Sequence, residues 1–142
     1  MKKILVLLVA AISLYANEAS EIAKNLGYLN SYKEAIALGK KEHKLVMLVL
    51  VKDGCPWCKK LERRTLENKK IKSMIEPFVK VIIDKHAEMP KYFETPIVPV
   101  VYFVDPKTEQ SVWEVAGYKD KNEFADDIDT AKQEFKSPDL AN

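Results

Sequence analysis

The stretch "KDGCPWCKKLERRTL", from Lys52 to Leu66, contains both cysteines of the chain. It follows an uninterrupted apolar run, "KLVMLVLV" at Lys44–Val51, which is typical of a strand buried on both faces. Asp53-Gly54 breaks this run, and Pro56 suits the first turn of a helix because its missing N–H is not needed there. The sequence therefore places the two thiols where a buried strand gives way to a helix.

The predicted helix has two different sides. At about 100° per residue, one side carries Cys58, Leu61, Glu62, Thr65 and Leu66. The other side carries Lys59, Lys60, Arg63 and Arg64. The predicted helix therefore has one mainly apolar side and one basic side.

Composition and charge limit the class of protein. With 142 residues the chain has room for one domain with a hydrophobic core. Its formal charge of +2 comes from Lys2 and Lys3, and the remaining charges are mixed along the sequence. This pattern gives no indication of a nucleic-acid-binding surface.

The N-terminus "MKKILVLLVAAISLYA" is typical of a secretory signal peptide at residues 1–16. Its apolar run is shorter than the ~20 residues needed to span a bilayer, which disfavours a permanent anchor. We expect residues 17–142 to form a single domain that works outside the cytoplasm, in a bacterial periplasm. In that compartment a disulfide between Cys55 and Cys58 would close too small a loop to act as a structural staple, so the spacing favours chemistry.

The remaining elements alternate between helix and strand. Residues 18–43 are predicted to be helical, with an apolar stripe before Gly39. Next come a short helix in "NKKIKSMIEPF" and a strand in "FVKVIID" that ends at Asp84. Two further strands follow at 99–105 and 111–117, and "PKTEQ" joins them. The last helix, in "KDKNEFADDIDTAKQEF", directs Phe124, Ile128 and Phe135 inward. Helices between strands imply a parallel pair and the hairpin adds antiparallel partners, so a mixed sheet is expected.

This order of elements resembles the thioredoxin fold, an α/β fold with a central mixed β-sheet flanked by helices. The resemblance covers roughly residues 30–136 and depends on the Cys-x-x-Cys at the start of a helix and on Val98-Pro99 ahead of the hairpin. Val98-Pro99 matches the family's cis-proline position, and Gly117 matches a glycine that usually follows the last strand. The resemblance implies a thiol–disulfide oxidoreductase with a redox-active Cys55–Cys58 disulfide and no dissociable cofactor.

The two cysteines have different expected roles. Cys55 at the helix N-terminus faces unpaired backbone N–H groups and the positive end of the helix dipole, which favour a thiolate. Its sulfur is expected to be exposed and to attack, whereas Cys58 is expected to resolve the mixed disulfide. Chance burial of two nearby cysteines is the alternative.

Val98 and Pro99 are expected to support the site. A cis Val98–Pro99 bond would bring the backbone beside the cysteines and offer the Val98 peptide group to an extended substrate strand. Since cis is the minority state of X–Pro bonds, this expectation depends on the resemblance. Alternatively, Pro99 only starts an edge strand.

Glu62 and the residues between the cysteines are further candidates. "CKKLERRTL" is similar to a Cys-Lys-x-x-Glu-x-x-Thr pattern in the DsbD C-terminal domain group, where the glutamate restrains ionisation of the attacking thiol. Alternatively, Glu62 lies on a solvated face. Pro56-Trp57 resembles the Pro-aromatic pairs of glutaredoxins and disulfide oxidases, and Trp57 either shields Cys58, docks a partner or is simply exposed.

The chain also departs from thioredoxin itself. The position of thioredoxin's buried aspartate, in the strand before the site, is occupied by Val49, which cannot take up a proton. Lys80 matches the lysine that partners this aspartate, but the aspartate is lost, so a role for Lys80 does not follow.

Metal and cofactor chemistry is disfavoured. Covalent haem attachment needs a histidine directly after the second cysteine, where this chain has Lys59. A structural zinc site needs about four ligands, and only His43 and His86 are available to join the thiols. A Cu(I) carrier needs only two thiolates and remains an alternative, as does a binding module with idle cysteines.

We therefore expect a periplasmic thiol–disulfide oxidoreductase that binds no metal and reduces or exchanges disulfides in exported proteins through its Cys-x-x-Cys dithiol. A disulfide oxidase or isomerase of the same fold is the alternative. Its expected partners are exported client proteins and a redox partner protein, for which a membrane thiol–disulfide reductase is one candidate. Neither nucleic acid nor stable membrane insertion after signal cleavage is expected.

Overall fold

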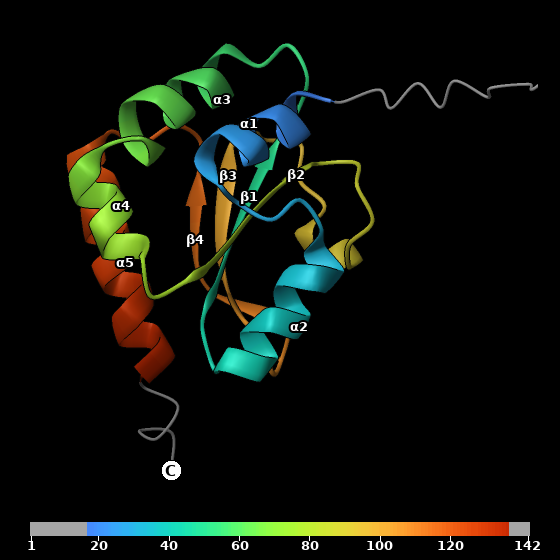
Figure 1. The fold of residues 1–142 in the computed structure, drawn as a ribbon, viewed down its shortest axis with the longest axis vertical. Coiled ribbons are helices and arrows are strands. Elements are labelled where there is room, and N and C mark those ends of the chain that lie inside the picture. Colours follow the sequence, from blue (N-terminus) through green and yellow to red (C-terminus); the bar gives the residue numbers. More distant parts are fainter. Residues whose placement is uncertain (1–16, 137–142) are drawn as a thin grey trace, which may run out of the picture.

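A computed structural model describes residues 17–136 of the chain. Its elements are helices around a four-stranded sheet, and the N-terminal helix lies on the same side of the sheet as the C-terminal helix (Figure 1). The helices are α1 (Glu18–Leu26), α2 (Tyr32–Glu42), α3 (Pro56–Leu61), α4 (Lys69–Ile75) and α5 (Lys121–Lys136). The strands are β1 (Val46–Val51), β2 (Val79–Asp84), β3 (Val100–Asp105) and β4 (Gln110–Ala116). A π-helical turn, η1 (Glu62–Leu66), continues α3, and a 3-10 turn, η2 (Lys91–Phe93), precedes β3.

The sheet has the strand order β2-β1-β3-β4 and is mixed, as predicted. β1 is parallel to β2 and antiparallel to β3, and β3 is antiparallel to β4. Every residue of β1 is buried, which explains the uninterrupted apolar run in the sequence.

The two faces of the sheet bury two hydrophobic clusters. Alternate residues of β1, such as Met47 and Val49, pack with α1, α3, α4 and α5 on one face. Leu48 and Leu50 pack with α2 and η2 on the other face. The fold is therefore a sheet between helical layers, and the thioredoxin-like architecture predicted from the sequence is confirmed.

The prediction of one helical segment over residues 18–43 was wrong, because this region contains two helices. Gly27 ends α1 in the left-handed region, with φ 73°. The chain then extends, Leu29 forms an isolated parallel bridge with Val81, and Ser31 caps α2. The break allows α1 and α2 to cover opposite faces of the sheet.

The predicted strands and the last helix agree with the structure within a residue or two. Phe124 and Ile128 of α5 are buried, whereas Phe135 is only partly buried against the same cluster. Gly39 does not end α2, which continues to Glu42. A Cβ atom at Gly39 would lie 2.8 Å from Cγ2 of Val46, so only glycine lets α2 approach β1 this closely.

The predicted signal peptide at residues 1–16 lies outside the described residues, as do residues 137–142. Over residues 17–136, none of the helices has the length and apolar character that crossing a bilayer requires.

Candidate active site

Cys55 and Cys58 form a disulfide at the junction of β1 and α3. Their Cα atoms are 5.3 Å apart. Cys55 is the N-cap of α3, Pro56 occupies the first helical turn, and the backbone N–H of Cys58 donates to Sγ of Cys55 at 3.2 Å. This N–H belongs to the first turn of the helix and has no carbonyl partner within it. A thiolate at Cys55 would therefore be stabilised by the same N–H.

Both cysteines are buried in this oxidised state. Cys55 is 5% exposed and Cys58 is 2% exposed, although the sulfur of Cys55 was expected to be exposed. The neighbouring Pro56 and Trp57 are exposed instead, and Trp57 retains 55% of its accessible surface. A partner would therefore meet these two side chains first when it approaches the disulfide.

The side of the helix that carries Cys58 is buried at every position. Cys58, Leu61, Glu62, Thr65 and Leu66 are each no more than 6% exposed. On the opposite side, Lys59 and Lys60 are partly exposed and Arg63 and Arg64 are exposed.

Glu62 is at the junction between α3 and the π-helical turn η1. Glu62 is 6% exposed, so the alternative that it lies on a solvated face is wrong. A π-turn is rare inside helices and often occurs at functional sites. It was not predicted from the sequence, whose apolar spacing fits an α-helix as well.

The Val98–Pro99 peptide bond is cis, as expected from the resemblance. The N–H of Gly117 donates to the carbonyl oxygen of Pro99 at 2.8 Å, which joins the end of β4 to the residue before β3. Gly117 has φ 79°, a conformation that favours glycine. Pro99 is buried and Val98 is partly exposed, packing against both hydrophobic clusters.

A second hydrogen bond ties this segment to the cysteine helix. The Oγ1 hydroxyl of the buried Thr65 donates to the carbonyl oxygen of Lys119 at 2.7 Å. The segment after β4 is thus fixed to both η1 and the Pro99 loop. The helical spacing puts Thr65 on the same side as Cys58, but no pattern in the sequence indicates this bond.

Trp57 belongs to an aromatic and cationic cluster that the sequence did not predict. Its ring centroid lies 5.7 Å from that of Tyr118. The ammonium group of Lys60 lies 4.6 Å from the centroid of each ring. Trp57 and Lys60 are three residues apart on one helix, but only the folded structure brings Tyr118 to them.

Lys80 and Val49 occupy the positions discussed above. Val49 is fully buried in β1, and Lys80 of β2 donates from Nζ to the carbonyl oxygen of Ile75 at 3.5 Å. Lys80 therefore contacts the end of α4, whereas the matching lysine of thioredoxin partners the buried aspartate.

The two histidines do not assemble a metal site with the thiols. His43 caps the end of α2, and His86 lies in the connection after β2. Within residues 17–136 there is no group of three or more histidine, cysteine, aspartate or glutamate residues arranged to hold a metal.

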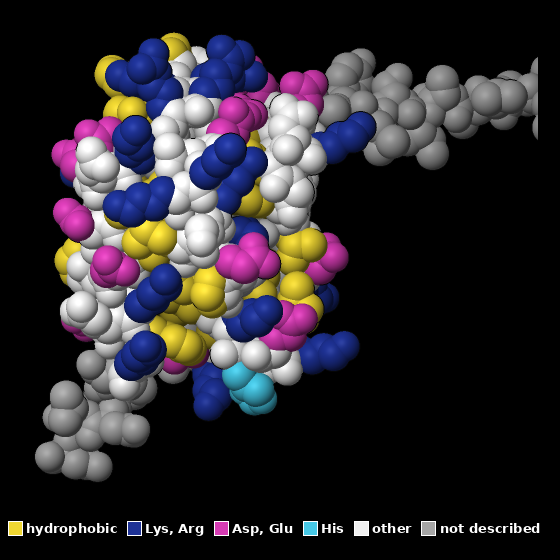
Figure 2. All heavy atoms as spheres, turned by 60° about the vertical axis from the view of Figure 1, so that its left-hand side comes forward, with side chains coloured by type: hydrophobic (Ala, Val, Ile, Leu, Met, Phe, Trp, Pro, Cys, Tyr) yellow, Lys and Arg dark blue, Asp and Glu magenta, His cyan; other side chains and the backbone are white. Residues whose placement is uncertain are grey.

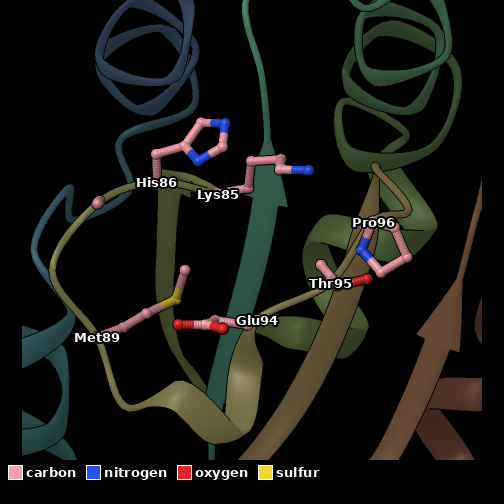
Figure 3. Close-up of a pocket in the computed structure, with 7 residues that line it drawn as sticks. Lys85, His86, Met89, Glu94, Thr95 and Pro96 are labelled. Atoms are coloured by element: carbon pink, nitrogen blue, oxygen red, sulfur yellow. The ribbon is translucent and has the colours of Figure 1, made fainter.

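His86 instead lines a hollow of about 500 Å³ between the end of β2 and the segment leading to Pro99 (Figure 3). Lys85 and His86 lie at one end of this hollow, Met89 and Glu94 at the other, and Thr95 at its side. None of the site residues predicted from the sequence lines it.

Comparison with known proteins identifies similar domains. A family model described as thioredoxin-like matches residues 28–106. The solution structure of a thioredoxin from Thermus thermophilus is 20% identical, with a TM-score of 0.66 over 74% of this chain and 86% of that one. No curated protein matches the chain.

Two further solved structures share the fold. The reduced form of the DsbD C-terminal domain from Neisseria meningitidis is 24% identical, with a TM-score of 0.57 over 72% of this chain and 92% of that one. A DsbH oxidoreductase is 18% identical, with a TM-score of 0.54 over 77% of this chain and 84% of that one.

Proposed function

Because the chain belongs to the thioredoxin-like family and carries the Cys55–Cys58 disulfide, it is a thiol–disulfide oxidoreductase, and we propose that it reduces disulfides of exported proteins. The observation that carries this proposal is the hydrogen bond from the Cys58 N–H to Sγ of Cys55 at the start of α3. It supports Cys55 as the attacking thiolate. Exported clients follow from the predicted signal peptide at residues 1–16, and export to the periplasm is part of the proposal.

The proposed reaction is a two-step exchange. The reduced Cys55 thiolate attacks one sulfur of a client disulfide, the client S–S bond breaks, and a mixed disulfide forms with release of one client thiolate. The Cys58 thiolate then attacks Sγ of Cys55, and the second client thiolate leaves. The client gains two electrons and two protons, and the chain ends with the Cys55–Cys58 disulfide, which a dithiol donor must reduce again.

The surrounding residues have supporting roles in this proposal. Trp57 and Pro56 provide the exposed surface beside the disulfide, and the Val98 peptide group pairs with an extended client segment. Glu62, buried one turn beyond Cys58, opposes formation of the Cys55 thiolate by like-charge repulsion when it is ionised.

The buried Glu62 also supports the reductive direction, because this position matches the Cys-Lys-x-x-Glu pattern of the DsbD C-terminal domain group. The Pro56-Trp57 pair supports the opposite direction, since it resembles that of oxidases. The net direction depends on how the reduction potential of the Cys55–Cys58 pair compares with the redox potential of its compartment.

The reduction potential of the purified protein is the decisive experiment. Equilibration with glutathione redox buffers should give a value nearer to about −270 mV, as in reducing thioredoxins, than to about −120 mV, as in DsbA. The reduced protein should also reduce insulin. An oxidising potential together with faster disulfide formation in a reduced client would make the protein an oxidase. Stoichiometric copper after reductive purification, with no insulin reduction, would make it a metal carrier.

A further inference from the structure

The outer side of the cysteine helix carries a concentrated positive charge. We call four cations on the solvent side of α3 and η1 the basic face: Lys59, Lys60, Arg63 and Arg64. Figure 2 shows Lys and Arg side chains gathered over the end of the molecule where α3 lies. Lys59 directly follows Cys58, so the basic face adjoins the disulfide.

This charge is not neutralised locally. Across residues 17–136, none of the four side chains lies within ion-pair distance of a carboxylate. The acid within this segment, Glu62, is buried on the opposite side of the helix. Because exposed cations without partners are free to interact with another molecule, the basic face is open to an anionic surface.

The charge is also local to this end of the molecule. Without Lys2 and Lys3 the chain has 21 Lys and Arg residues and 21 Asp and Glu residues, so the remainder is formally neutral. The four cations of the basic face leave 17 Lys and Arg residues against 21 Asp and Glu residues in the remainder. The positive excess on the cysteine helix is therefore offset by a negative excess spread over the rest of the sequence.

Lys60 connects the basic face to the exposed ring beside the disulfide. Its ammonium group is held over both Trp57 and Tyr118, at 4.6 Å from each centroid. This contact fixes one cation next to a half-exposed aromatic surface, which is the combination found at protein–protein interfaces. Arg64 and Tyr118 also line a hollow of about 340 Å³ together with Asp120 and Lys121, so the surface beyond η1 carries charges of both signs.

We propose that the basic face selects redox partners by charge, so that this protein exchanges disulfides preferentially with proteins whose disulfide is flanked by acidic residues. The inference rests on the proposed function, because it concerns the partner of the same disulfide. Complementary charge raises the rate of encounter more than it raises affinity, so the preference should appear in the second-order rate constant.

Three disulfide-bonded model peptides test this proposal with the reduced protein: one flanked by Asp and Glu, one by Lys and Arg, and one uncharged. At low salt the acidic peptide should be reduced about fivefold faster than the uncharged one, and the basic peptide more slowly. Raising the ionic strength to about 0.3 M should remove most of this difference, because exposed charges are screened within a shorter distance.

Two charge-matched variants locate the effect. Arg63→Glu with Arg64→Glu should abolish or invert the ratio of acidic to uncharged rates. Lys33→Glu with Lys41→Glu changes the net charge equally on exposed positions of α2 and should leave the ratio close to that of the unmodified protein. Circular dichroism of both variants establishes that they are folded, and Arg63→Gln with Arg64→Gln should give an intermediate ratio.

The outcomes separate this inference from the proposed function. Failure to reduce the uncharged peptide would overturn the proposed function itself. Reduction of all three peptides at equal rates would overturn the proposal that the basic face selects partners. An equal loss of the ratio of acidic to uncharged rates in both charge variants would overturn it as well. The protein could instead sediment with phosphatidylglycerol vesicles, lose this binding in the Arg63 and Arg64 variant, and show no peptide preference. That result would assign the basic face to a membrane surface and overturn its proposed role in selecting partners.

Discussion

Thr65 donates a hydrogen bond from its hydroxyl to the carbonyl oxygen of Lys119 at 2.7 Å, across 54 residues of sequence. The donor lies on the inner side of the turn that follows the cysteines, and Thr65 is fully buried. The acceptor lies directly after Tyr118, whose ring contacts Trp57. One hydroxyl therefore links the cysteine helix to the segment that supports its exposed tryptophan.

Removing this hydroxyl should destabilise the protein. Thr65→Val keeps the shape of the side chain but leaves the Lys119 carbonyl without its donor, and we expect a loss of about 1–3 kcal/mol in the free energy of unfolding. Urea denaturation measures this loss. Thr130→Val in α5 is the control, because its hydroxyl bonds only the Asp126 carbonyl four residues earlier on an exposed surface. Equal losses in both variants would contradict a special role for Thr65.

The two cysteines should behave differently when each is replaced. Cys55→Ser removes the attacking thiolate and should abolish insulin reduction. Cys58→Ser permits attack without resolution and should accumulate mixed disulfides with clients. Non-reducing electrophoresis of both variants after incubation with an oxidised client distinguishes them. Equal trapping through Cys58 in the Cys55→Ser protein would reverse the assignment.

Replacing Glu62 should change the acidity of Cys55. Glu62→Gln removes a negative charge from the buried side of the helix, so the pKa of the Cys55 thiol should fall, because a nearby negative charge disfavours a second one. Titration of the thiolate absorbance measures the change in the reduced protein. Glu67→Gln, at the exposed end of the same turn, is the matched control. Superimposable curves for Glu62→Gln and the unmodified protein would show that Glu62 does not act on the thiol.

Lys60 should restrain Trp57. Lys60→Met keeps much of the apolar stem but removes the cation over the two rings, which is worth about 0.5–1 kcal/mol at exposed sites. In a Trp113→Phe background, fluorescence quenching by acrylamide reports Trp57 alone, and it should increase in Lys60→Met. Lys59→Met is the control, since no ring contact of Lys59 occurs in the described part of the chain. Unchanged quenching would leave Trp57 held by Tyr118 alone.

Tyr28 should limit stability in alkali. Burial raises the pKa of Tyr28 above its usual value of 10.0, so the folded protein keeps a proton that the unfolded chain releases. The free energy of unfolding is therefore not reduced by Tyr28 below about pH 10, and it falls as the pH rises further. Tyr28→Phe should move alkaline unfolding to higher pH. At neutral pH it should cost little, because the buried hydroxyl has no hydrogen-bond partner within residues 17–136.

The control for this experiment is Tyr92→Phe, since Tyr92 is 58% exposed. Circular dichroism as a function of pH follows unfolding of both variants. An alkaline midpoint that stays the same in Tyr28→Phe would assign the loss of stability to other groups.

Much of the fold could be predicted because single elements carry strong patterns. The apolar run of β1 is buried on both faces, and the inner side of the cysteine helix repeats with helical spacing. Both patterns follow from the periodicity of burial, which the sequence displays directly. The pairing of Cys55 with Cys58 could likewise be predicted, because only two residues lie between them at the start of a helix.

The parts that could not be predicted depend on contacts between distant segments. Residues 18–43 were predicted as one helical segment, whereas α1 ends at Gly27 and Leu29 forms a bridge with the distant Val81. The contact of Tyr118 with Trp57 and Lys60 joins residues about 60 positions apart, so no local pattern contains it. The π-turn at Glu62 changes the hydrogen bonding of the backbone without changing which side of the helix is apolar.

The hydrogen bond from Gly117 to Pro99 has a consequence for the catalytic cycle. Neither this bond nor the one from Thr65 to Lys119 involves a sulfur atom. Opening the disulfide therefore breaks neither cross-link directly. The backbone on both sides of the thiols is held by bonds that are independent of the S–S bond itself.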